Sequence, residues 1–178
     1  MSNLENAKYF LTIKPNKLLR PSQTRWLSLQ MVVKKILLNW QPLTLFFQGA
    51  LLEDRLQSSQ NILNALSNPI YKLYFLFLNF ILEIVNKLNL EFQSEKPKIT
   101  NLYDNVTNLY KLVLRSFIKK EIVDGYNLSD LDPSNKKYFN DLSQLYLGAE
   151  VEQFLKENCE NLNEDDIMSF QCKCRVLH

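Results

Sequence analysis

The most apolar stretch of the chain sets the first limit on its fold. It runs from Leu73 to Val85 (LYFLFLNFILEIV) and is apolar on nearly every helical face. Its thirteen residues, interrupted by Asn79 and Glu83, fall short of the about 20 apolar residues that a membrane-spanning helix needs. A helix that is apolar all round is one enclosed by neighbouring elements. We therefore predict a core helix over about residues 70–92 and no membrane contact.

Glycine is too scarce for most alternatives to an all-α fold. Three glycines in 178 residues leave few positions for tight hairpins or for the Gly-rich loops that cradle phosphates. Strand-like alternation is absent, and apolar residues recur at helical spacing. These spacings predict further helices over residues 24–40, 43–51 and 102–117, with Pro42 opening the second. The predicted fold is an irregular multi-helix bundle around the 70–92 helix.

Breaks in these patterns divide the chain into four segments. We predict an irregular basic N-terminal segment over residues 1–23 and a main helical domain over residues 24–123. A linker rich in turn-forming residues follows over residues 124–135, and acidic C-terminal helices cover residues 136–178.

In the C-terminal segment, KKYFNDLSQLYLG and AEVEQFLKENC are each predicted to form a short helix. Asn163 is a predicted cap for a last helix, whose first turn holds Glu164, Asp165 and Asp166, acids that a helix dipole favours there. No stop signal follows before His178, so we expect a truncated chain.

Charge is distributed unevenly along the sequence. Residues 1–35 hold seven Lys or Arg against one acidic residue, whereas residues 121–167 hold twelve acids against three bases. A basic surface of this kind is typical of nucleic-acid binding. Two solvated surfaces that offset each other account for it equally simply, and charge alone favours that second interpretation.

No residue pattern predicts a metal site or a catalytic site. Cys159, Cys172, Cys174 and His178 match no common zinc spacing, so we predict small buried thiols in a reducing, intracellular compartment. One histidine cannot build a Ser-His-Asp arrangement. Adjacent acids diverge by about 100° around a helix and do not share a site. We predict no catalytic residues, no metal and no cofactor.

The dipeptide Arg25-Trp26 permits two interpretations. Trp26 lies on the apolar stripe of its helix and can simply be the first core residue. Alternatively, its indole stacks on an unpaired base while Arg25 holds a phosphate, and such stacking contributes on the order of 1–3 kcal/mol. The candidate DNA-binding residues are Trp26, Arg25, Lys34, Lys35, Arg20 and Lys17.

Three blocks of the sequence resemble one protein family. These are KPNKLLRPSQTRWLSLQMVVKKILLNWQPLTLFF, FLNFILEIVNKLNLEFQSEKPKI and LYDNVTNLYKLVLRSFIKKEI, in this order within about residues 10–123. They resemble hAT-superfamily transposases and the host proteins descended from them, among them BED- and MYM-type zinc-finger proteins. The resemblance implies the all-α insertion of an RNase H-like domain. By the match of TRW, Trp26 would stabilise a flipped base beside Arg25.

The resemblance also implies what the chain lacks. The family's catalytic acids lie before and after the insertion, and two-metal chemistry needs carboxylates that converge on ions about 4 Å apart. We therefore expect a nuclear protein that is not an enzyme: a helical scaffold or protein-interaction module, with protein partners or parent-like transposase chains. The alternatives are a residual DNA-binding element, weak and salt-sensitive, and a non-functional remnant.

Overall fold

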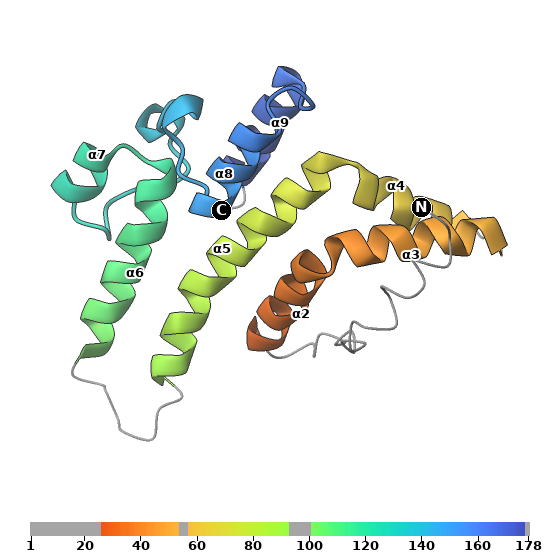
Figure 1. Cartoon of the computed structure of the whole chain (residues 1–178). Helices are drawn as coiled ribbons and strands as arrows, with labels where there is room; N and C mark the ends of the chain where they lie inside the picture. The colour runs from red at the N-terminus through yellow and green to blue at the C-terminus, as the bar shows by residue number, and fades with distance from the viewer. Residues whose placement is uncertain (1–25, 54–56, 93–100, 177–178) are drawn as a thin grey trace. The chain divides into compact units, whose positions relative to one another are not determined.

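The computed structural model describes residues 26–53, 57–92 and 101–176 (Figure 1). These residues form eight α-helices, labelled α2 to α9, and two short 3-10 turns, η2 and η3, without any strand. The predicted all-α class is confirmed. The chain divides into two compact units whose boundary falls inside α5, between Phe75 and Leu76, and each unit is described by itself.

The first unit contains α2 (Trp26–Leu38), α3 (Trp40–Glu53), α4 (Gln57–Ser67) and the start of α5 (Pro69–Phe92). Figure 1 shows a bend between α2 and α3. Pro42 explains it, because proline has no N–H to donate to the carbonyl of Leu38 four residues earlier and its ring crowds that carbonyl. The second helix thus begins at Trp40, two residues before the proline that was expected to open it.

Trp40 joins three helices of this unit. Its indole N–H donates to the carbonyl of Leu66 at the end of α4, over 3.0 Å. Its ring meets Phe75 of α5 edge to face, with centroids 5.6 Å apart. Phe46, one of the apolar residues at helical spacing in the predicted 43–51 helix, is exposed.

The predicted core helix is confirmed, since α5 spans Pro69–Phe92. Its start is set by Pro69, which is tolerated in a first turn, and by Asn68, whose side chain accepts the N–H of Ile70 over 2.9 Å. Five of its apolar side chains are buried: Leu73, Leu76, Phe77, Leu82 and Ile84.

Over Pro69–Leu90, with a mean hydropathy of 1.4, α5 is also long and apolar enough to cross a membrane. Core helices of soluble proteins meet the same measure, so it is weak evidence for a membrane.

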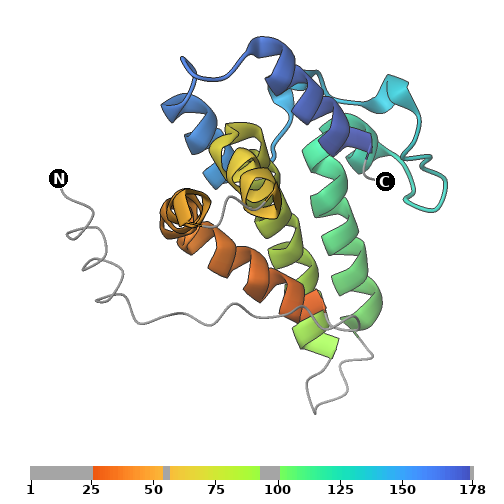
Figure 2. The same cartoon turned by 90° about the vertical axis from the view of Figure 1, so that its right-hand side faces the viewer.

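The second unit holds the rest of α5 with α6 (Leu102–Phe117), α7 (Lys120–Gly125), α8 (Ala149–Glu157) and α9 (Glu164–Val176). Figures 1 and 2 show α6 beside α5. The ring of Phe77 on α5 lies edge to face with Phe117 of α6 and with Phe170 of α9, at centroid distances of 6.3 and 6.4 Å. Three helices therefore share one aromatic core.

The prediction of a helix over KKYFNDLSQLYLG is wrong. Only the 3-10 turns η2 (Lys136–Tyr138) and η3 (Leu142–Gln144) form there. The backbone instead pairs with the end of α6, where the N–H of Asn140 donates to the Phe117 carbonyl over 2.9 Å. The last carbonyls of a helix have no partner within it, and pairing with them holds this segment extended.

The predicted cap of the last helix is confirmed. The side-chain oxygen of Asn163 accepts the N–H of Asp165 over 3.1 Å, and the first turn of α9 holds three acids.

Candidate functional site

The structure describes few of the residues predicted to bind DNA. Lys17, Arg20 and Arg25 lie outside the described residues, and Trp26 begins α2 with a side chain that is also outside them. Lys34 is exposed and Lys35 is half-buried on the same helix. The DNA-binding role of this set stays a prediction.

The prediction of buried thiols is right for one cysteine of three. Cys174 is buried, whereas Cys159 and Cys172 are exposed. Residues two apart in a helix point to different faces, so Cys172 and Cys174 cannot both face the core; Cys174 does so with Phe170, four residues before it. Burial raises the pKa of the Cys174 thiol to about 12. In the described part of the chain, no three His, Cys, Asp or Glu side chains come together as metal ligands would.

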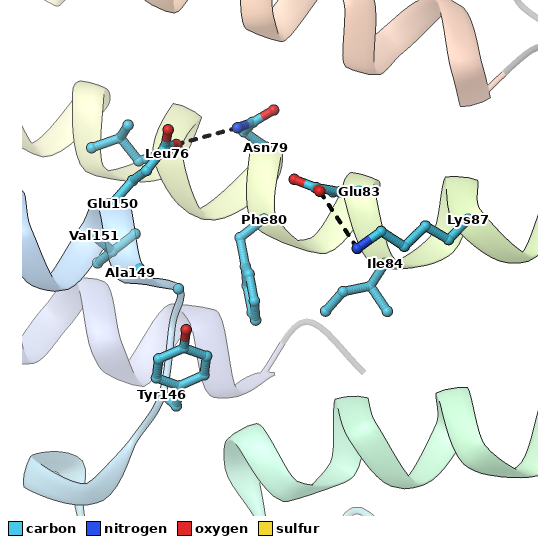
Figure 3. A pocket seen from close by; sticks show the side chains of 11 residues that line it. Leu76, Asn79, Phe80, Glu83, Ile84, Lys87, Tyr146, Ala149, Glu150 and Val151 are labelled. Carbon is cyan, nitrogen blue, oxygen red and sulfur yellow. Dashed lines mark hydrogen bonds and ion pairs between the residues drawn. The ribbon is translucent and has the colours of Figure 1, made fainter.

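A pocket of about 300 Å³ lies in the second unit, between α5 and the start of α8 (Figure 3). One face of α5 supplies most of its wall, and the rest comes from Tyr146, Gly148 and the first turn of α8. The α5 residues repeat at helical spacing, which places them in one row; they are Leu76, Asn79, Phe80, Glu83, Ile84 and Lys87.

Gly148 permits the close approach that forms this pocket. Its φ is +107°, a conformation that other residues rarely adopt, and a Cβ added here would lie 2.8 Å from Cγ of Phe80. Without that Cβ, Phe80 can lie against the backbone that enters α8. The ring of Tyr146 then meets Phe80 edge to face, with centroids 5.5 Å apart. Half of the surface of Tyr146 stays exposed.

Two carboxylates lie on the polar rim. Glu150, in the first turn of α8, accepts the side-chain N–H of Asn79 over 3.2 Å. Asn79 is 8% exposed, and its Oδ1 has no hydrogen-bond partner among the described residues. Figure 3 shows this oxygen turned away from Phe80 and Tyr146, so Asn79 orients Glu150 and does not present an acceptor to the pocket.

The second carboxylate, Glu83, pairs with Lys87 one turn later on α5, at 3.5 Å. Both side chains are largely exposed, and pairs of this kind contribute about 0–1 kcal/mol because water screens them. An incoming cation can therefore replace Lys87 at little cost. The pocket offers an apolar wall, two aromatic rings and, among the described residues, one carboxylate without an ion pair, Glu150. This arrangement suits a cation on an apolar stem.

This site was not predicted from the sequence. Phe80, Gly148 and Glu150 are far apart along the chain, and only their folded arrangement brings them together. The single local signal is Gly148 directly before a helix in a chain with three glycines, which marks a position where the backbone needs unusual freedom.

Comparison with known proteins adds no identification. The chain matches no protein-family description, no curated protein and no solved structure.

Proposed function

We propose that this chain is a non-catalytic helical module of a hAT transposase-derived nuclear protein, and that it binds another protein. Its origin is supported by the order of the three sequence blocks that resemble that family, together with the all-α fold. The observation that carries the binding role is the pocket beside Gly148, which is apolar within and acidic at its rim. Its proposed ligand is a lysine or arginine side chain of the partner.

The electrostatics of the second unit support a basic partner. Residues 76–178 contain sixteen Asp or Glu against twelve Lys or Arg, a net charge of −4. A shallow depression next to the pocket shares Tyr146 and Ala149 with it and adds two acids, Glu152 and Glu157, and one base, Lys156. A basic segment would thus find acids on both sides of Tyr146, and opposite charges raise the rate of encounter as well as its specificity.

Labelled peptides test this proposal with the full chain. Fluorescence anisotropy would compare a flexible peptide carrying arginine between two leucines with the same peptide carrying glutamate. We expect the arginine peptide to bind. Glu150→Gln, which removes the charge and keeps an acceptor for Asn79, should weaken its binding, as should Tyr146→Ala.

Glu160→Gln is the matched control, because Glu160 is an exposed acid outside the pocket. Equal binding of the two peptides, or equal weakening by the Glu150 and Glu160 substitutions, would show that the pocket is not the binding site. Circular dichroism of each variant separates loss of binding from loss of structure.

A second candidate function is DNA binding by the first unit. Residues 1–75 hold nine Lys or Arg against three acids, a net charge of +6, and Lys34 is exposed on α2. We propose weak binding whose affinity falls steeply with salt, as phosphate contacts dictate. Anisotropy with hairpin and single-stranded oligonucleotides would compare Trp26→Ala with the unchanged chain. Identical curves would remove the base-stacking role of Trp26.

The non-catalytic role has its own test. We expect no cleavage or strand transfer of DNA by the purified chain with Mg²⁺ or Mn²⁺. Cleavage that persists through further purification would overturn this part of the proposal.

A further inference from the structure

The outer face of α2 and α3 carries an apolar residue at every seventh position. Met31, Leu38, Leu45 and Leu52 are 50%, 79%, 45% and 82% exposed. Three polar residues follow the first three of them at a distance of three, and they are exposed as well: Lys34, Gln41 and Gln48. We call these seven residues the heptad face.

Helical geometry places these residues in one row. Seven residues are nearly two turns of an α-helix, and a step of three or four returns to the same side, so the row has the spacing of the a and d positions of a coiled coil. The bend at Asn39 does not break the register, because the hydrogen bonds from each residue to the fourth before it continue through it. The N–H of Asn39 donates to the Lys35 carbonyl over 3.1 Å, and the N–H of Leu43 donates to the Asn39 carbonyl over 2.8 Å.

The core of the first unit uses a different face of the same two helices. Val33 is buried, and Trp40 contacts Leu66 and Phe75 on the inner side. The heptad face is therefore surplus to the packing of this unit. An exposed row of apolar residues with polar side chains between them marks an interaction surface, and its repeat suits another helix.

Charge indicates which kind of helix fits. From Trp26 to Leu52 the sequence contains no acidic residue, while Lys34 lies in the heptad face and Lys35 beside it. A partner helix that carries glutamate or aspartate beside its apolar row complements these lysines. A second copy of the chain fits less well, because two heptad faces would bring lysines together without any acid.

We propose that the heptad face is a docking surface for an amphipathic helix of another protein, one with a seven-residue apolar repeat flanked by acidic residues. The bend divides the surface into two stretches, with Met31 and Leu38 on α2 and Leu45 and Leu52 on α3. This surface lies in the first unit and does not depend on the pocket of the second.

The probe is a labelled helical peptide of four heptads, with leucine at a and d and glutamate at e and g. A second peptide has lysine in place of glutamate. Anisotropy with the full chain should show binding of the glutamate peptide and much weaker binding of the lysine peptide. Replacing Leu38 and Leu52 together by glutamine should weaken binding at least about tenfold, as expected when the two most exposed apolar residues of the row lose their contacts.

Lys34→Glu should shift the preference toward the lysine peptide. The matched control is Ile62→Gln, which changes an exposed apolar residue of α4 outside the heptad face. All these positions are exposed, so the variants should keep the circular dichroism spectrum of the unchanged chain.

Three results would overturn the proposal. One is equal affinity for the two peptides, and another is weakening by Ile62→Gln as large as that by the double leucine replacement. The third is sedimentation of the unchanged chain as a dimer that Leu38→Gln with Leu52→Gln converts to a monomer, since the occupant would then be a second copy.

Discussion

Replacing Gly148 by alanine should strongly destabilise the second unit. The φ of +107° leaves a non-glycine residue strained, and such conformations cost of the order of 1–3 kcal/mol. The new Cβ would also lie 2.8, 2.9 and 3.0 Å from Cγ, Cβ and Cδ2 of Phe80, so side chain or backbone must move. Overpacking of this kind costs about 1–3 kcal/mol. Together these effects lower the free energy of unfolding by roughly 2–6 kcal/mol.

Urea denaturation followed by far-UV circular dichroism measures this loss. With a urea dependence of about 2 kcal/mol per M, the midpoint should fall by roughly 1–3 M. Gly49→Ala and Gly125→Ala are matched controls, because a Cβ at either position meets no atom within 4 Å and neither backbone has a positive φ. Both controls should remain within about 1 kcal/mol of the unchanged chain or become slightly more stable.

A double variant separates the two causes. Phe80→Ala removes Cγ and Cδ2, two of the three atoms that the new Cβ would meet, but leaves the backbone strain. The Gly148→Ala, Phe80→Ala chain should therefore be less destabilised than the sum of its single variants. The reasoning is refuted if Gly148→Ala unfolds at the same urea concentration as the two glycine controls.

Three further outcomes follow from the second unit. Phe170→Ala should lower the free energy of unfolding by about 3–5 kcal/mol in urea, because its fully buried ring contacts the aromatic core. A thiol reagent at pH 8 should modify the two exposed cysteines at once and Cys174 only after denaturation, since burial raises the Cys174 pKa to about 12; rapid reaction of all three thiols would contradict this. A hydrogen bond from Arg115 lowers the pKa of Asp124 below its ordinary 3.8, so this carboxylate contributes stability above that pH and loses it as the pH falls through the folded-state pKa. Asp124→Asn should make the acid-induced loss of stability smaller, measured by thermal unfolding between pH 2 and 6, and an unchanged pH profile would exclude the effect.

Local signals sufficed to predict the helices whose ends are set by short-range chemistry. Asn68 and Pro69 start α5, and Asn163 with its three following acids starts α9, because a cap and a first turn involve only neighbouring residues. The segment from Lys136 to Gly148 could not be predicted in this way. Its backbone pairs with residues Ser116 to Lys119, at and just after the end of α6. The paired residues lie 19 to 30 positions apart, and such long-range pairing leaves no periodic pattern in the sequence.

The pocket escaped prediction for the same reason. In the sequence, Asn79 is an interruption of an apolar run, and Glu150 is one of the acids of the predicted helix AEVEQFLKENC. Both descriptions are correct but incomplete, because the side chains of Asn79 and Glu150, 71 positions apart in the sequence, form a hydrogen bond. The sequence shows which residue types are present, but which ones face each other depends on how α8 lies against α5.

The heptad face differs from the pocket, because its seven-residue repeat is present in the sequence but is masked by the other apolar residues of the same helices. Apolar residues are so frequent from Trp26 to Leu52 that a core stripe and a seven-residue row can both be drawn through α2 and α3. Spacing alone cannot separate them, because both rows obey the period of the same helix. Exposure separates them, since Val33 and Trp40 face the core while Leu38 and Leu52 face water. A helix pair with two apolar faces has more apolar surface than one small unit can bury, and a second helix is the simplest way to cover the remainder.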